Sequence, residues 1–150
     1  MLFRSEDEFA TSAAFVESLD FAGMHVFRYS KRPGTGAARM RGHVREDVKK
    51  QRSAAMIRRA AGMQQRYAER FAGTARPVLW EHVAGATADG FINVGYTDNY
   101  IRVNCIHPRP LTGLVLPARL DRYDAGRGQM SAVVELEFGE AERAAARSYN

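Results

Sequence analysis

The sequence predicts an α+β protein in which helical segments come first and a small β-barrel comes last. Apolar residues recur every three or four positions over residues 6–19 and again over 44–71, as in amphipathic helices. One strand-like run, residues 24–29, lies between them. From residue 78 onward, turn residues separate short runs rich in β-branched and aromatic side chains. Five such runs at regular spacing favour a small five-stranded antiparallel barrel.

Composition bounds the possible functions. The 150 residues give room for one ordinary domain, or for a small domain and part of another. The 22 Lys and Arg exceed the 17 Asp and Glu, and the net charge of +5 permits an anionic partner. The single cysteine, Cys105, excludes an internal disulfide and a multi-cysteine metal or iron–sulfur site. No apolar stretch is long enough to span a membrane and the N-terminus is charged, so we expect a cytoplasmic protein without a membrane partner.

The first helical segment has a clear start. Ser5 and Glu8 match a capping box, and the apolar stripe over residues 6–19 is expected to face a sheet. The strand predicted at 24–29 follows it. A helix and a single strand cannot bury both of their faces, so this pair needs further strands to pack against.

A basic loop follows the predicted strand. Proline and glycine stop regular structure there, and loops at strand ends are where α/β enzymes place functional groups. Arg32 has a planar fork that suits a phosphate or carboxylate. The alternative is that the hydroxyl groups only bond nearby backbone and that Arg32 faces solvent. The candidates in this loop are Tyr29, Ser30, Arg32, Gly34 and Thr35.

Residues 36–43 look like an irregular linker, and the long helix that follows is basic on one face. Its one-sided charge suggests a stripe facing phosphates, with Lys49 and Lys50 as RNA-binding candidates. A solvated helix surface is the plainer interpretation. Arg52 falls beside the apolar stripe and is expected to reach a carboxylate or carbonyl group.

The barrel candidates flank one hairpin. Aromatic rings beside a cation suit single-stranded RNA, whose splayed bases stack on π faces. The alternative is that one tyrosine belongs to the core and that Asn99 only supplies the left-handed geometry of the turn. Cys105 is expected to be a small buried hydrophobic residue. The expected strands are 78–83, 90–96, 100–105, 113–122 and 130–138, and the RNA-binding candidates are Arg76, Tyr96, Asn99, Tyr100 and Arg102.

Two stretches resemble a known family. Residues 25–35, HVFRYSKRPGT, resemble a segment near the end of the radical-SAM domain of methylthiotransferases, closest to the branch that acts on threonylcarbamoyladenosine in tRNA. Residues 95–103, GYTDNYIRV, are similar to the signature of the TRAM domain that closes these enzymes. This resemblance implies an OB-like barrel. It also implies a remnant of a radical-SAM partial barrel at 1–43, a connecting basic helix at 44–72, a TRAM barrel at 73–138 and a tail at 139–150.

The resemblance also implies an activity and partners. Such enzymes place a methylthio group on adenosine beside the anticodon, using four-iron four-sulfur clusters and S-adenosylmethionine. With one cysteine, this chain holds neither cluster, so no cofactor is expected in it. We therefore expect a chain that begins inside a larger domain and forms the C-terminal tRNA-binding portion of such an enzyme, inactive alone. Its expected partners are the tRNA anticodon stem-loop and the missing N-terminal and radical-SAM parts.

Two alternatives remain open at this point. In the first, the chain is a free-standing RNA-binding module of the TRAM or OB type without catalytic activity. Alternatively, the barrel docks a protein, which salt-insensitive binding without RNA retention would indicate.

Overall fold

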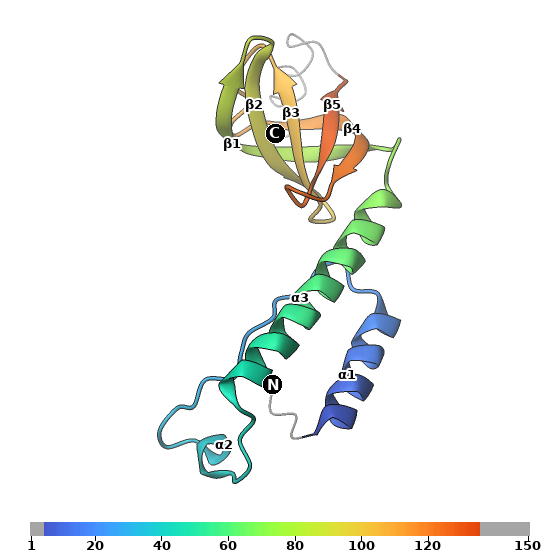
Figure 1. Cartoon of the computed structure of the whole chain (residues 1–150). Helices are drawn as coiled ribbons and strands as arrows, with labels where there is room; N and C mark the ends of the chain where they lie inside the picture. Colours follow the sequence, from blue (N-terminus) through green and yellow to red (C-terminus); the bar gives the residue numbers. More distant parts are fainter. Residues whose placement is uncertain (1–4, 136–150) are drawn as a thin grey trace, which may run out of the picture. The chain divides into compact units, whose positions relative to one another are not determined.

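The structure is a computed structural model that describes residues 5–135 of the chain. The chain divides into two compact units, Met1–Tyr67 and Ala68–Asn150 (Figure 1). The finer division expected from the sequence stays a prediction. The expected tail at 139–150 and the end of the expected fifth strand lie outside the described residues.

The first helix forms where its capping signals place it. Helix α1 spans Glu6–Leu19, as predicted. Ser5 Oγ accepts a hydrogen bond from the Glu8 backbone N–H at 3.1 Å, and Glu8 Oε2 accepts one from the Ser5 N–H at 3.1 Å. This reciprocal pair satisfies two N–H groups that a helix start leaves open. Asp20 ends the helix in the left-handed conformation.

The strand predicted at 24–29 does not form, and that prediction is wrong. No residue from 21 to 31 makes a backbone–backbone hydrogen bond within the described chain. Met24 and Val26 nevertheless pack against the small core of Phe9, Ala13 and Met56. The apolar pattern thus sets which side chains turn inward. A strand also needs a neighbouring backbone to complete its ladder, and the described part of this unit offers none.

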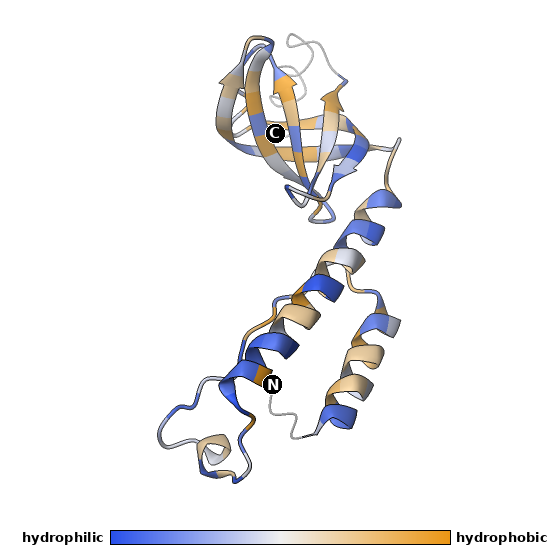
Figure 2. Ribbon diagram, in the orientation of Figure 1, coloured by the Kyte–Doolittle hydropathy of each residue, from blue (hydrophilic) through white to orange (hydrophobic). Residues whose placement is uncertain are grey.

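Two more helices follow α1 in the described residues, and the second of them ends just beyond Tyr67. The short helix α2, Gly36–Arg39, lies in the stretch expected to be irregular, and Thr35 caps it. Helix α3 runs over Glu46–Glu69, close to the predicted bounds. Its buried residues Met56, Ala60 and Met63 follow helical spacing, whereas hydrophilic residues occupy much of the remaining surface (Figure 2).

The C-terminal unit contains a closed five-stranded barrel. Its strands are β1 Ala75–Thr87, β2 Gly90–Thr97, β3 Arg102–His107, β4 Val115–Asp124 and β5 Gln129–Val134. They follow one another around the barrel in the order β1-β2-β3-β5-β4. Five strands in this closed order confirm the OB-like prediction.

One detail of the barrel corrects the sequence-based prediction. Four neighbouring strand pairs are antiparallel, but β3 and β5 pair in parallel, through Val103 with Met130 and Asn104 with Ser131. This pair closes the barrel. Because its strands are far apart in the sequence, no hairpin signal announces their direction.

The barrel has a packed interior and one obligatory glycine. Trp80, Leu116, Leu120 and Met130 are fully buried there. A Cβ atom on Gly95 would collide with the backbone carbonyl of Leu79, so only glycine lets β2 approach β1 so closely. Within residues 5–135, no helix combines the length and the apolar character needed to cross a membrane.

Candidate nucleic-acid interface

The turn between β2 and β3 presents the most exposed aromatic side chain of the barrel. Tyr100 is 86% exposed and has φ of +63°, a left-handed conformation that residues other than glycine rarely adopt. The alternative interpretation, in which Asn99 supplies the left-handed geometry of the turn, is therefore wrong. Asn99 instead accepts a hydrogen bond from the Thr97 hydroxyl at 2.6 Å, and Thr97 Oγ1 accepts one from the Ile101 N–H at 2.9 Å. These bonds fix the turn and leave the Tyr100 ring in solvent.

A shallow groove lies beside this turn on the outer surface of the barrel. Two aliphatic side chains in it, Leu79 and Val115, are 46% and 55% exposed, and the Tyr96 ring lies half-buried between strands. Aliphatic and aromatic groups of this kind form a surface on which a flat base can stack. The groove is lined by Pro77, Leu79, Glu81, Tyr96, Thr97, Asp98, Tyr100 and Val115.

Two arginines near the hairpin differ in their availability. Arg76 donates from Nε and Nη2 to both carboxylate oxygens of Asp98, each at 2.8 Å, and its guanidinium lies 5.1 Å from the centre of the Phe71 ring. The hydrogen bond from Arg76 holds the pKa of Asp98 below its usual value. Arg102 is exposed on β3, and its side chain makes no hydrogen bond or ion pair with residues 5–135. Arg102 is thus the cation of this hairpin that can meet a phosphate without first losing a protein partner.

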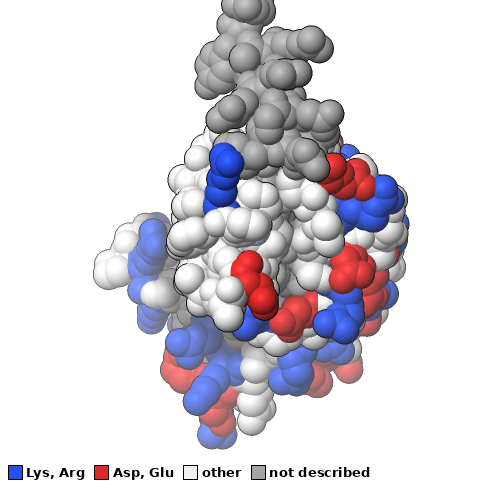
Figure 3. Space-filling view, turned by 90° about the horizontal axis from the view of Figure 1, so that it is seen from above, with Lys and Arg blue, Asp and Glu red and all other residues white. Residues whose placement is uncertain are grey.

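One face of the molecule has mixed charge. On the face drawn in Figure 3, acidic and basic side chains are interspersed around a largely uncharged area. A surface without a single dominant sign does not attract nucleic acid by its field alone. A nucleic acid on this face would therefore have to be held by specific contacts, such as stacking and single phosphate contacts.

The loop candidates of the N-terminal unit do not form one cluster. Thr35 and Gly34 shape the turn: Thr35 Oγ1 donates to the Arg32 carbonyl at 2.9 Å and accepts from the Ala38 N–H at 3.2 Å, and Gly34 has φ of +84°. Ser30 and Arg32 are exposed, and neither side chain bonds to any residue between 5 and 135. Turn stabilisation therefore accounts for Gly34 and Thr35 but leaves Ser30 and Arg32 available.

Tyr29 is held by two neighbours. Its ring stacks on the His43 ring at 5.7 Å between centres and 9° between planes. The Lys49 ammonium group lies 5.3 Å from the centre of the same ring and bonds to Glu46 Oε1 at 2.6 Å. Lys49 is therefore an internal cation with 11% of its side chain exposed, whereas Lys50 is exposed.

Arg52 does what its position beside the apolar stripe predicts. Its Nη2 donates to the Ser5 carbonyl at 3.0 Å and to Glu6 Oε2 at 2.9 Å, which ties α3 to the start of α1. The prediction that it reaches a carboxylate or a carbonyl is confirmed, and both are reached.

Sequence reasoning missed three participants: His43, Leu79 and Val115. Leu79 had a usable signal, because it stands between the buried Val78 and Trp80 and must face outward if β1 alternates. The stacking of His43 on Tyr29 had none, since the two rings are brought together by the path of the intervening loop.

The donor groups of this chain do not fit an iron–sulfur cluster. Within residues 5–135, no three His, Cys, Asp or Glu side chains gather as a metal site would require. Burial in β3 raises the pKa of Cys105 to about 12, so its thiol stays protonated and is a poor ligand. The clusters implied by the family resemblance need several thiolates, and the sequence has one cysteine.

Comparisons with known proteins bear on the same residues. No family model matches the chain. It is 33% identical over 138 residues to the threonylcarbamoyladenosine tRNA methylthiotransferase MtaB of Bacillus subtilis. The matched region covers 91% of this chain and 31% of the Bacillus protein. The chain is a homologue of the tRNA methylthiotransferases. The family resemblance of the two sequence motifs is thereby confirmed.

Other tRNA methylthiotransferases match over shorter or similar lengths. The MtaB protein of Thermotoga maritima is 34% identical over 100 residues, and this match covers 65% of this chain and 22% of the Thermotoga protein. The tRNA-2-methylthio-N(6)-dimethylallyladenosine synthase of Staphylococcus aureus is 29% identical over 133 residues, covering 89% and 26%. The chain thus spans less than a third of the length of these methylthiotransferases.

Proposed function

We propose that this chain is the C-terminal, tRNA-binding portion of a tRNA methylthiotransferase of the threonylcarbamoyladenosine type. The observation that carries this proposal is its similarity, over 91% of its length, to an enzyme whose name specifies tRNA and that modification. The OB-like barrel supports the binding role, because barrels of this kind bind oligonucleotides. The anticodon stem-loop is the proposed contact, since its unpaired bases are free to stack.

In this proposal, Tyr100 of the hairpin and the neighbouring groove contact bases, and Arg102 of the hairpin contacts a phosphate. The exposed Tyr100 ring offers a π face to an unstacked base, and the neighbouring groove continues that apolar surface through Leu79. Arg102 then meets a backbone phosphate. Arg76 has a different role in this arrangement, because its ion pair with Asp98 keeps the carboxylate next to the turn neutralised.

The chemistry of methylthiolation belongs, in this proposal, to parts of the enzyme that hold the clusters. Cys105 is the only cysteine of this chain, and it is buried. The chain contributes by holding the tRNA so that the target base reaches those parts. Alone, it is expected not to cleave S-adenosylmethionine, and an anaerobic reconstitution assay that found cleavage would contradict this.

The proposal is tested by a salt titration of the full chain with an unmodified anticodon stem-loop RNA. We expect a dissociation constant on the order of micromolar at low salt, weakening steeply as salt rises. Tyr100→Ala should weaken binding by about tenfold because it removes a stacking platform. Arg102→Ala should reduce the slope of affinity against salt by about one phosphate contact.

Arg122→Ala is the matched control. Arg122 is an exposed arginine on β4, outside the hairpin and the groove. If Arg122→Ala and Arg102→Ala have the same effect on the salt slope, the hairpin is not the binding site. If the wild-type chain does not retain the stem-loop at low salt, the tRNA-binding proposal is overturned.

A free-standing RNA-binding module is the second candidate. The observation that favours it is the closed barrel, which has a packed interior of its own within residues 75–134. The two candidates differ in the RNA they select. A module of this kind should bind an unrelated single-stranded RNA as tightly as the stem-loop, whereas a methylthiotransferase portion should prefer the stem-loop.

A further inference from the structure

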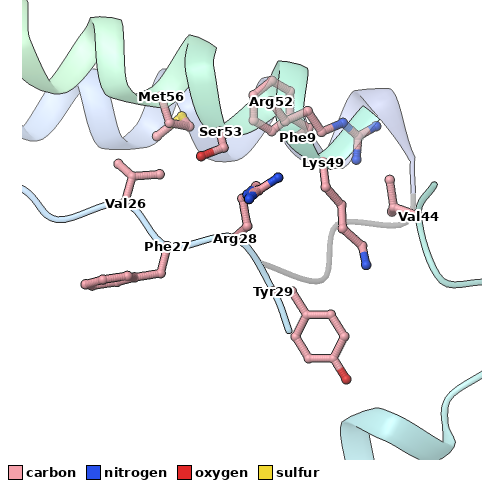
Figure 4. Close-up of a pocket in the computed structure, with 10 residues that line it drawn as sticks. All are labelled: Phe9, Val26, Phe27, Arg28, Tyr29, Val44, Lys49, Arg52, Ser53 and Met56. Atoms are coloured by element: carbon pink, nitrogen blue, oxygen red, sulfur yellow. The ribbon is translucent and has the colours of Figure 1, made fainter. Parts of the chain in front are cut away.

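The N-terminal unit contains a narrow, partly open pocket between residues 26–29 and α3 (Figure 4). Apolar side chains, among them Phe9, Val26 and Met56, form part of its wall. The cavity has a volume of about 30 Å³, which is room for about one water molecule. Its lining includes three cationic side chains and no carboxylate, so the lining carries an excess of positive charge.

The three cations differ in how they are balanced. Lys49 and Arg52 are 11% and 14% exposed, and each is bonded to a carboxylate that lies outside the lining, Glu46 at 2.6 Å and Glu6 at 2.9 Å. Arg28 makes no hydrogen bond or ion pair with residues 5–135. Figure 4 shows its side chain reaching toward α3 beside Lys49 and Ser53. Arg28 therefore forms no close ion pair, and its charge acts on Glu46 only at longer range, where it helps to lower the pKa of that carboxyl.

A second, more polar pocket adjoins the first and adds another unbalanced cation. The two pockets share residues 27–29, and the second is also lined by Ser30, Lys31 and Glu46. Lys31 is exposed and has no ion pair within the described chain. Glu46 is the one acidic residue in this lining, and it balances only part of the nearby charge, because Lys49 bonds to it and Arg28 also acts on it. The shared rim thus has an excess of positive charge with hydroxyl groups nearby.

We propose that Arg28, together with Lys31 and the Lys49 ammonium group, forms a binding site for a phosphate-type oxyanion. The guanidinium fork of Arg28 supplies two parallel donors that match phosphate oxygens, and the lysines add positive charge without a fixed geometry. The adjacent apolar wall strengthens the attraction by lowering the local dielectric constant. The phosphate belongs either to a free nucleotide or to an RNA backbone, and both present the same oxyanion to this rim.

The first test uses inorganic phosphate and the full chain. Isothermal titration at constant ionic strength, with chloride replacing phosphate in the reference, should show saturable binding to the wild type. Arg28→Gln should weaken binding about tenfold, because it removes the charge-assisted fork. Arg58→Gln is the matched control, since Arg58 is an exposed arginine of α3 that lines neither pocket, and it should bind as the wild type does.

A second measurement needs no variant. In the wild-type chain, added phosphate should shift the side-chain NMR resonances of Arg28 and Lys49 along one saturable curve while those of Arg58 stay in place. The proposal is overturned if phosphate produces no saturable change by either method. It is equally overturned if Arg28→Gln and Arg58→Gln lower phosphate affinity to the same extent.

Two further probes distinguish the sources of the phosphate. Adenosine 5′-monophosphate should bind at least as tightly as inorganic phosphate if the site takes a free nucleotide. A short single-stranded RNA without terminal phosphates should bind with a dependence on Arg28 if the site takes an RNA backbone. Either result supports the site, and a lack of Arg28 dependence with all three probes overturns it. The barrel proposal is judged separately, on the Tyr100 and Arg102 variants.

Discussion

Tyr100 combines an exposed aromatic ring with a backbone conformation that costs free energy. Its φ of +63° lies in the left-handed region, where a Cβ atom crowds the following carbonyl. Strained residues of this kind cluster at functional sites, which agrees with the proposed stacking role. We expect Tyr100→Gly to be more stable to unfolding than Tyr100→Ala by about 1 kcal/mol, because glycine adopts this φ without the clash.

Urea unfolding of the two variants measures this difference in stability. Both variants lack the ring, so the comparison isolates the backbone. Equal free energies of unfolding would show that the turn relaxes to a negative φ once the ring is gone. RNA binding should be weak in both variants, since neither offers a stacking surface.

Cys105 should be chemically inert in the folded protein. Burial raises the pKa of its thiol from 9.0 to about 12, because the barrel interior disfavours the charged thiolate. At pH 8 to 9 the unfolded chain therefore releases this proton more readily than the folded chain, so rising pH favours unfolding through this group. We expect negligible reaction with iodoacetamide at pH 8 and rapid reaction in denaturant. Fast labelling of the folded chain, followed by mass spectrometry, would contradict this placement.

Whether a site residue can be predicted depends on how far away its partner lies. The contacts of Arg52 were foreseeable in kind, because a cation beside an apolar stripe must find an oxygen. The pairing of Arg76 with Asp98 was not, because it joins positions 22 residues apart through the register of β1 and β2. Arg76 and Arg102 both stay RNA-binding predictions, to which the structure adds that Arg76 is paired with Asp98 and that Arg102 is exposed.

At the scale of elements, the segment from residue 21 to 31 is the least supported by backbone bonds. It makes no backbone–backbone hydrogen bond within the described chain, although Met24 and Val26 are partly buried. We expect the amides of residues 24–29 to exchange with deuterium far faster than those of β2, whose backbone is paired on both sides. Hydrogen exchange followed by mass spectrometry measures this. Equal protection in the two segments would mean that residues 24–29 have a pairing partner.

Local signals predicted most elements, and non-local pairing explains the failures. The capping box of α1 and the periodicity of α3 depend on residues a few positions apart, so both helices were found nearly to their ends. Strand character at 24–29 was also a local signal, but a strand exists only when a second backbone pairs with it. The parallel pairing of β3 with β5 is the opposite case, because each strand finds a partner that is distant in the sequence and that no local signal predicted.

At the scale of the whole molecule, each compact unit has buried residues of its own. Phe9, Ala13 and Met56 form a small core in the N-terminal unit, and Trp80 and Leu120 are fully buried in the barrel. The two units should therefore lose structure separately. Met56→Ala should destabilise the N-terminal unit by about 2 to 5 kcal/mol, because it leaves a cavity in a core with few other members.

Hydrogen exchange resolved by segment tests this independence. In Met56→Ala, the amides of α1 should lose protection while those of β2 keep theirs, since the barrel core is untouched. Leu120→Ala is the reciprocal variant, and it should expose the barrel strands and spare α1. If both variants accelerate exchange in α1 and β2 alike, the chain unfolds as one cooperative body. The barrel would then depend on the N-terminal unit for its stability, and a free-standing RNA-binding barrel would no longer be a tenable alternative.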